Sequence, residues 1–432
     1  MEYPKVLVIS NNSFSKTSNN GRTLGNLFIG WPKDRLAQFC ISTTEPDYEV
    51  CDNYYLLTDK SILNAFKRFG KGKRCEVDAN LGTAGNTVVG GKKLFKTPWK
   101  ALARHIVWSG RRWNSKQFKE WVQAFAPEIV VVMNSDATFI LDIASYIAKK
   151  RHIPLVMYNT EGFYFLKRMY SHNSGWFSEL ALKLYQSIYK RHFRKMMKRV
   201  VMSIHLNSML EADYRKEFGG NHLVLYTGSE LKFDSSDLHT DNPTFTYLGN
   251  FGFDRPSALI EIAEVLQSIN PKYKLNIYGR IPSPEIKAKF DACPGVVYKG
   301  MVPYAEVIKV MYGSTILFHA ETQTPMFEDA LRYGFSTKIA DSISSGHPFL
   351  MYSSPNIAGA KYIIETGAGW HAKDRNELRE KILSILEDKS QRETILEKAR
   401  RAAKDNHMAP KNSEIFRIAL CKLAGINNEL KL

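Results

Sequence analysis

Residues 334–350, GFSTKIADSISSGHPFL, combine a helix start, a helix end and the beginning of a strand in one short stretch. Ser336 or Thr337 can cap a helix, because a hydroxyl accepts hydrogen bonds from the first free backbone N–H groups. Gly346 suits the helix end, where left-handed backbone is common. An apolar run up to Tyr352 then predicts a buried strand. The stretch therefore predicts a helix that leads into a strand, as in a parallel α/β sheet.

The same alternation of strand and helix signals extends through most of the chain. Helical patterns such as Asp136–Lys150 and Ser257–Ile269 have apolar residues at every third or fourth position. Short apolar strands joined by such helices predict parallel sheets covered on both faces. The expected strands are Lys5–Ile9, Leu36–Ile41, Glu128–Met133, Pro154–Tyr158, Val200–Ile204, His222–Tyr226, Phe245–Leu248, Lys274–Tyr278, Val296–Tyr298, Thr315–His319 and Pro348–Tyr352.

The length of 432 residues fits two domains of similar size. The polar segment 231–243 interrupts the alternation and predicts a linker. We expect a first α/β domain at 1–235 and a second at 244–404, followed by a C-terminal helical segment at 405–432 that packs back on the first domain. Within the first domain, residues 60–119 form a basic, aromatic insertion.

Composition limits the compartment and the partners. The five cysteines are scattered and form no CxxC or Cys/His cluster, which favours a reducing compartment without a structural metal. No apolar run is long enough to span a membrane, and we expect no secretory leader because the first strand starts close to Met1 without a long apolar segment before it. The net charge of +17 lies mostly in residues 1–240 and predicts an anionic partner, whether a membrane surface, a phosphorylated acceptor or nucleic acid.

Ligands of parallel sheets bind where loops and helix N-termini follow the strands. After the first strand, Gly21 and Arg22 open a helix and are candidates for an acceptor or phosphate loop. Glu161 and Asp136 follow two other strands, and either is a candidate general base or acceptor-hydroxyl ligand. A carboxylate at these positions also suits a simple helix cap, and the sequence leaves that alternative open.

The second domain has two candidate phosphate sites. Asn250 lies in a tight turn after a strand, and Arg255 follows at the start of a helix capped by Asp254, where phosphate is favoured. Lys338 and Asp341 share one face of the helix that begins near Ser336. This pair suits a ligand with phosphate and sugar hydroxyls, and a surface ion pair is the alternative.

The ordered segments YLGNFGFDR, NIYG, VVYKGMVPYAEV, ILFHAE and GFSTKIADSISSGHPFL resemble the donor-binding domain of GT-B retaining glycosyltransferases, closest to enzymes of bacterial capsule, exopolysaccharide and lipopolysaccharide synthesis. The resemblance covers residues 245–400. NNGRTLGNLF and IPLVMYNTEG extend it more loosely into the first half. It implies two Rossmann-like domains that face each other across a cleft.

The resemblance also implies roles for individual residues. Asp341 matches the acidic residue that binds the nucleotide ribose, whereas Tyr333 replaces the family's usual first glutamate. Glu321 resembles the glutamate of an HxE variant, which implies contact with the donor hexose. Contact with the donor diphosphate is implied for Asn250, Arg255, Ser336, Thr337 and Lys338.

Together these features predict a transferase that moves a sugar from a nucleotide sugar to a hydroxyl of a lipid-linked saccharide. The chain has no Asp-x-Asp, so fixed cations rather than a metal or other cofactor are expected to stabilise the leaving diphosphate. The resemblance implies retention, but Glu161 or Asp136 would serve an inverting mechanism, and both remain open.

We expect the protein to be cytoplasmic and peripherally bound, through its basic half, to the anionic inner face of the cell membrane. The expected contact combines the basic insertion with an amphipathic helix near Trp176–Ile188. A GT-B-fold sugar-nucleotide epimerase or hydrolase is one alternative. A basic nucleic-acid-binding protein is the other, but no nucleic-acid partner is expected because no recognition motif is present.

Overall fold

The computed structural model describes residues 2–15, 19–41, 46–64, 73–75, 97–167, 176–235 and 238–426. The chain divides into two compact units, Met1–Leu225 with Pro410–Leu432, and Tyr226–Ala409. The division precedes the expected linker, because the segment after Tyr226 is hydrogen-bonded within the second unit. The hydroxyl of Ser229 donates to Asp341, and the carbonyl of Lys232 accepts from the hydroxyl of Tyr312.

The first unit contains an eight-stranded sheet in the order β4-β3-β2-β1-β5-β6-β7-β8. All neighbours are parallel except the pair β3 and β4. Its elements are β1 (Val6–Ile9), α1 (Asn19–Asn26), β2 (Leu36–Cys40), β3 (Tyr54–Leu56), α2 (Asp59–Asn64), β4 (Lys73–Cys75), α3 (Pro98–Trp108), α4 (Lys116–Phe125), β5 (Ile129–Met133), α5 (Thr138–Arg151), β6 (Leu155–Asn159), α6 (Trp176–Met197), β7 (Val200–His205), α7 (Ser208–Phe218), β8 (His222–Val224) and α16 (Ala409–Leu423).

The second unit contains a six-stranded, fully parallel sheet in the order β11-β10-β9-β12-β13-β14. Its elements are β9 (Phe245–Leu248), α8 (Arg255–Ile269), β10 (Leu275–Tyr278), α9 (Pro284–Asp291), β11 (Val296–Gly300), α10 (Tyr304–Tyr312), β12 (Ile316–Ala320), α11 (Pro325–Leu331), α12 (Thr337–Ser345), β13 (Phe349–Tyr352), α13 (Ala358–Thr366), β14 (Trp370–Ala372), α14 (Arg375–Glu387) and α15 (Lys389–Ala402).

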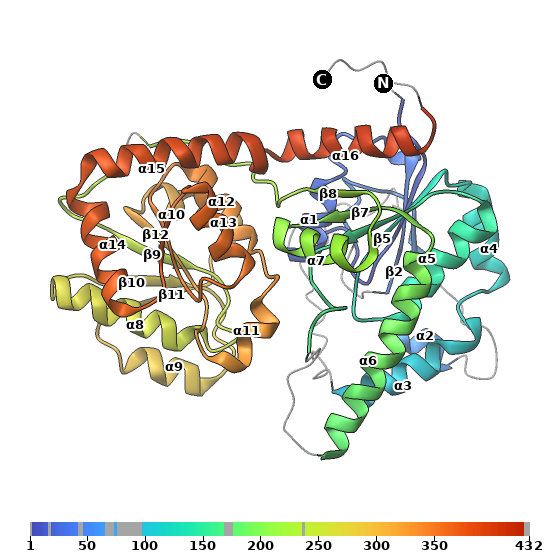
Figure 1. Ribbon diagram of the computed structural model, residues 1–432, viewed down its shortest axis with the longest axis horizontal. Coiled ribbons are helices and arrows are strands. Elements are labelled where there is room, and N and C mark those ends of the chain that lie inside the picture. Colours follow the sequence, from blue (N-terminus) through green and yellow to red (C-terminus); the bar gives the residue numbers. More distant parts are fainter. Residues whose placement is uncertain are drawn as a thin grey trace. The chain divides into compact units, whose positions relative to one another are not determined.

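Helices lie on both sides of each sheet (Figure 1), which buries the central strands on both faces. Buried strands of this kind are apolar along their whole length, as in IVVVM of β5. The core of the first unit includes Phe416 and Leu420 of α16, so the last helix packs on the sheet formed by the start of the chain.

Strands with several consecutive apolar residues lie within one or two positions of their expected bounds. Three short strands, β3, β4 and β14, were not expected, because they contain too few residues for a periodic signal. Most of the expected basic insertion, residues 65–72 and 76–96, lies outside the described residues. Its described part consists mainly of α2, α3 and the start of α4.

Candidate functional site

A buried ion pair lies at the carboxyl edge of the second sheet. Arg255 is the first residue of α8, which follows β9, and Glu321 directly follows the neighbouring strand β12. The Nη2 atom of Arg255 lies 2.7 Å from Oε1 of Glu321, and the two side chains are only 10% and 8% exposed. The tertiary structure therefore joins two residues that stand 66 positions apart in the chain.

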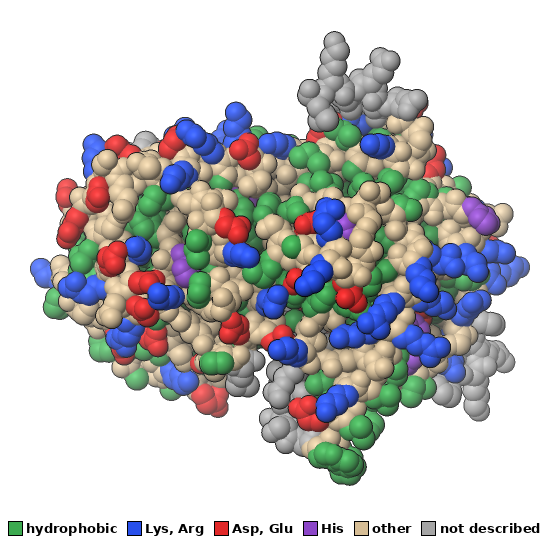
Figure 2. Space-filling view, in the orientation of Figure 1, with side chains coloured by type: hydrophobic (Ala, Val, Ile, Leu, Met, Phe, Trp, Pro, Cys, Tyr) green, Lys and Arg blue, Asp and Glu red, His purple; other side chains and the backbone are tan. Residues whose placement is uncertain are grey.

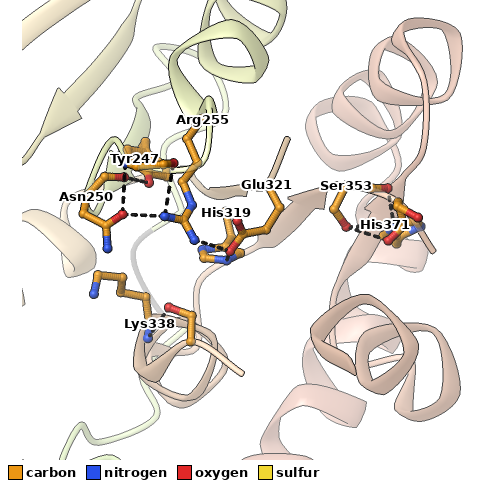
Figure 3. Close-up of polar contacts among 11 residues, drawn as sticks. Tyr247, Asn250, Arg255, His319, Glu321, Lys338, Ser353 and His371 are labelled. Carbon is orange, nitrogen blue, oxygen red and sulfur yellow. Dashed lines mark hydrogen bonds and ion pairs between the residues drawn. The ribbon is translucent and has the colours of Figure 1, made fainter. Parts of the chain in front are cut away.

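Two further side chains extend this pair into a polar cluster (Figure 3). The Nε2 atom of His319 lies 3.1 Å from Oε1 of Glu321. The Oδ1 atom of Asn250 accepts a hydrogen bond from Nη1 of Arg255, and its backbone carbonyl accepts one from the hydroxyl of Tyr247 at 2.7 Å. The cluster thus contains one cation, one carboxylate, an imidazole and an amide.

The charges of the cluster stabilise each other despite burial. Burial alone would raise the pKa of Glu321, but the hydrogen bond from His319 and the charge of Arg255 outweigh it, so the pKa is lowered. Burial opposes the charge of Arg255, whereas Glu321 favours it, and the pKa of Arg255 is raised. Both groups are therefore ionised at neutral pH.

The same cluster contains polar atoms that the protein does not satisfy. Within the described residues, Nε of Arg255, Nδ1 of His319 and Oε2 of Glu321 are buried and make no hydrogen bond. Buried polar atoms are normally paired, because leaving one unpaired costs about 1–3 kcal/mol. Oε2 of Glu321 is thus suited to accept a hydrogen bond from a hydroxyl group of a ligand.

The N-terminus of α12 lies on the same side as this cluster. Ser336 occupies the N-cap, as expected, and its Oγ accepts a hydrogen bond from the backbone N–H of Lys338 at 3.4 Å. Thr337 is the first helical residue. The half-buried side chain of Lys338 runs toward Asn250 (Figure 3). A helix N-terminus and a lysine ammonium near Asn250 form a positive region beside the buried ion pair.

Asp341 lies one turn further along α12. Its carboxylate is buried, and Oδ1 accepts a hydrogen bond from the hydroxyl of Ser229 at 2.7 Å. Ser229 was not expected at this site, because it precedes Asp341 by 112 positions and belongs to no motif. The expected cap at Asp254 is wrong: its backbone is left-handed, and its carboxylate accepts from Ser257 instead of capping the helix.

Close backbone packing marks the same edge of the sheet. Gly249 follows β9 and Gly279 follows β10, and a Cβ added to Gly279 would lie 1.9 Å from the carbonyl oxygen of Gly249. The backbone of Gly279 is also left-handed, with φ of +156°. Only glycine fits there, so the two turns beside Asn250 approach more closely than side chains allow.

In the first unit, the four candidate residues follow three neighbouring strands, β1, β5 and β6. Glu161 is exposed just after β6, whereas Asp136 is buried just after β5, and the hydroxyl of Tyr185 donates to its backbone carbonyl at 2.5 Å. Arg22 is half-buried in α1. Gly21 is buried, and a Cβ there would lie 2.6 Å from the carbonyl oxygen of Ser13. Gly21 therefore allows helix α1 to pack closely against the loop at Ser13.

The comparison with solved structures identifies the fold. No family model and no curated protein sequence matches this chain. Among solved structures, Anabaena Alr3699/HepE in complex with UDP superposes with a TM-score of 0.61 at 14% identity, over 97% of this chain and all of that one. The same protein with UDP-glucose gives 0.60 at 12% identity, over 96% and 99%.

Two further structures are similar along nearly their whole length. Sucrose-phosphate synthase from Thermosynechococcus elongatus has a TM-score of 0.60 at 12% identity, over 98% of this chain and all of that one. WaaG, a glycosyltransferase involved in lipopolysaccharide biosynthesis, has a TM-score of 0.50 at 13% identity, over 95% and 99%. The fold is GT-B. The expectation of two Rossmann-like α/β domains of this class is thereby confirmed.

Proposed function

We propose that the protein is a nucleotide-sugar-dependent glycosyltransferase that extends a lipid-linked saccharide in cell-surface polysaccharide synthesis. The observation that carries the proposal is the buried cluster of Arg255, Glu321, His319 and Asn250 with unsatisfied polar atoms. It lies at the carboxyl edge of a parallel sheet, where ligands of this class of fold bind.

The chemistry of sugar transfer fits the two parts of this site, the buried cluster around Glu321 and the N-terminus of α12 with Lys338. As the bond from the anomeric carbon to the diphosphate breaks, negative charge develops on the phosphate oxygens. Lys338 supplies positive charge for these phosphate oxygens. The N-terminus of α12, at Ser336 and Thr337, adds backbone N–H donors and the positive end of the helix dipole. These fixed groups suit a leaving diphosphate without a metal ion.

The donor sugar is assigned to Glu321 in this proposal. An ionised carboxylate with a free buried oxygen accepts a hydrogen bond from a hexose hydroxyl strongly. Arg255 and His319 hold the carboxylate in place through Oε1. A diphosphate therefore meets Arg255 as part of a neutral pair, so Lys338 carries more of the phosphate interaction than the family resemblance implies.

The remaining assignments follow the same logic. Asp341, held by Ser229, is the candidate ligand of the nucleotide ribose. Glu161 is the more accessible of the two first-unit carboxylates and so the better candidate for contact with the acceptor hydroxyl, whereas Asp136 is buried. Arg22, close to Gly21, is the candidate cation for a phosphate of the acceptor.

The ligands and pathways of the structural neighbours support a nucleotide sugar as the donor and a saccharide as the acceptor. HepE was solved with UDP and with UDP-glucose, and WaaG acts in lipopolysaccharide biosynthesis. At identities of 12–14% these neighbours leave the sugar and the acceptor of this chain to experiment.

Contact with an anionic membrane is the second part of the proposal. Across the described residues, no helix is both long enough and apolar enough to cross a bilayer. Trp176, Phe177, Leu180 and Leu184 on α6 are 72%, 66%, 51% and 51% exposed, while Tyr185 is buried. Figure 2 shows a group of hydrophobic side chains at one end of α6 and lysines and arginines further along it. Exposed aromatic and aliphatic side chains next to cations are typical of peripheral membrane binding.

Donor binding is tested by thermal shift against UDP-, GDP-, ADP- and CMP-sugars, each with EDTA and with added divalent metal. One sugar nucleotide at a hundred times its dissociation constant should stabilise the protein by about 2.7 kcal/mol. Lys338→Gln and Glu321→Gln should weaken this effect, whereas Lys289→Gln, an exposed lysine on α9, should not.

Three outcomes contradict parts of the proposal. No stabilisation by any sugar nucleotide rejects the transferase. Stabilisation that disappears with EDTA rejects the metal-independent site. Release of free sugar or an epimer from the selected donor, with no transfer to any saccharide acceptor, assigns the protein to the epimerase or hydrolase alternative.

A further inference from the structure

The first unit contains a second candidate site, a groove of about 410 Å³ between α3, α5 and α6. Its floor runs along one face of α5, from Thr138 through Asp142 and Tyr146 to Lys149. These positions are three or four residues apart, so they form one stripe of the helix. The groove therefore extends away from the start of α5, where Asp136 lies, toward the opposite end of that helix.

The groove is strongly basic. Arg111, Lys149, Lys195 and Arg199 contribute to its lining, and the only carboxylate among the described lining residues is that of Asp142. Of the described residues, none forms an ion pair with Lys149, Lys195 or Arg199, whereas Asp142 is already hydrogen-bonded to His192 at 2.9 Å. Unpaired cations around a concave surface attract an anion.

Two histidines also line the groove and contact neighbouring side chains through Nδ1. The Nδ1 atom of His105 lies 2.8 Å from Oγ1 of Thr138, and Nδ1 of His192 lies 2.9 Å from Oδ1 of Asp142. The rings contact each other edge to face, with centroids 5.3 Å apart. In both rings Nε2 has no hydrogen-bond partner among the described residues, so each ring presents one unpaired nitrogen to the groove.

Aromatic contacts order one wall of the groove. The indole of Trp108 stacks on Phe139 with ring centroids 3.9 Å apart, and its Nε1 donates to Asp59 at 2.8 Å. The guanidinium of Arg111 lies over the ring of Tyr146, 5.2 Å from its centroid. These contacts hold the aromatic part of the wall in place, whereas the exposed side chains of Lys149, Lys195 and Arg199 can turn toward a bound anion.

The exposed apolar residues continue the stripe of α6 that lines the groove. Phe177, Leu184 and Lys195 are separated by seven and eleven residues, which places them on one side of the helix with His192 and Arg199 nearby. On α3, Trp99 and Ile106 are seven residues apart and are 53% and 59% exposed. A membrane surface that lies along this side of α6 would contact the apolar side chains at one end of the helix and the cations of the groove toward the other.

We infer that this groove binds the terminal phosphate of a phosphomonoester lipid headgroup. The inference rests on the membrane contact in the proposed function and adds a specificity to it. A phosphomonoester has three terminal oxygens and up to two negative charges, so it can enter a concave site that holds several cations. The phosphate of a phosphodiester is flanked by two ester groups and carries one charge, so it binds the rim only as a diffuse counterion.

The test measures binding to phosphatidylcholine vesicles that contain either phosphatidate or phosphatidylglycerol, adjusted to equal surface charge. The unmodified protein should prefer phosphatidate by about tenfold, equivalent to about 1.4 kcal/mol. Lys149→Gln/Lys195→Gln should abolish this preference. The matched control Lys150→Gln/Lys183→Gln also removes one exposed lysine from α5 and one from α6, but neither lines the groove, so it should keep the preference.

Further arms separate the possible sources of phosphate and the possible failures. Glycerol 3-phosphate at constant ionic strength should compete with phosphatidate vesicles, whereas competition without any vesicle preference overturns the lipid source. Equal binding to both vesicles by the unmodified protein overturns the inference. Sugar-nucleotide binding should be the same in both double variants as in the unmodified protein. If the unmodified protein binds no sugar nucleotide but prefers phosphatidate, only the transferase proposal is rejected.

Discussion

The buried pair of Arg255 and Glu321 should be strongly coupled in stability. Hydrogen-bonded guanidinium and carboxylate groups place their charge centres about 4 Å apart, which corresponds to about 4 kcal/mol at an effective dielectric constant of 20. Removing one partner of such a buried pair costs about 3–5 kcal/mol, because the other charge is left uncompensated. We expect Arg255→Met to lower the unfolding free energy of the second unit by this amount.

The assay is a double-mutant cycle followed by urea unfolding. Arg255→Met and Glu321→Gln are measured singly and together, and the double variant should lose about 3 kcal/mol less than the sum of the single losses. In thermal scans the single variants should unfold roughly 6–20 °C lower, since a domain of this size loses about 2–4 °C per kcal/mol.

A surface pair of the same unit provides the control. Nη2 of Arg375 lies 2.8 Å from Oε2 of Glu264, but these side chains are 53% and 46% exposed. Water and salt screen such a pair, so its coupling should be below about 1 kcal/mol. If the buried cycle gives the same coupling as this surface cycle, the argument that burial makes the Arg255–Glu321 pair strong is refuted.

Three further predictions follow from other contacts. Ser229→Ala should destabilise the second unit by about 1–3 kcal/mol and weaken donor binding, because the buried carboxylate of Asp341 loses a hydrogen bond; unchanged urea unfolding and donor affinity would contradict this. Burial, then the neighbouring His222, lowers the pKa of His205 to about 3, so this ring is neutral when folded but protonated when unfolded below about pH 6.5. The unfolding free energy should therefore fall as pH drops below 6.5, by up to about 1.4 kcal/mol per pH unit for this group, and His205→Gln should show a shallower slope between pH 6.5 and 4.5. Gly21→Ala should destabilise the first unit by about 1–3 kcal/mol, because its Cβ would clash with the carbonyl of Ser13; a neutral effect by calorimetry would show that the loop yields.

The sequence by itself determined the fold class and most of the strands. Buried parallel strands consist of uninterrupted apolar residues. The run IVVVM at Ile129–Met133 therefore predicts a strand without any information about the strands beside it. Both ends of α12 were also predictable from local sequence. Ser336 caps the start of the helix through its own side chain, and Gly346 adopts at the end the left-handed backbone that glycine favours. Such features depend on residues a few positions apart.

The tertiary structure decided which polar residues meet. Glu321 and Arg255 were separate candidates in the sequence, and only the adjacency of β9 and β12 joins them into one ion pair. The sequence did not predict Ser229 as the hydrogen-bond partner of Asp341, because a single serine belongs to no periodic pattern or motif. The basic groove likewise depends on three helices that are distant in the chain. Local patterns fix secondary structure through short-range backbone chemistry, whereas a buried charge or a concave site depends on long-range packing, which no local pattern encodes.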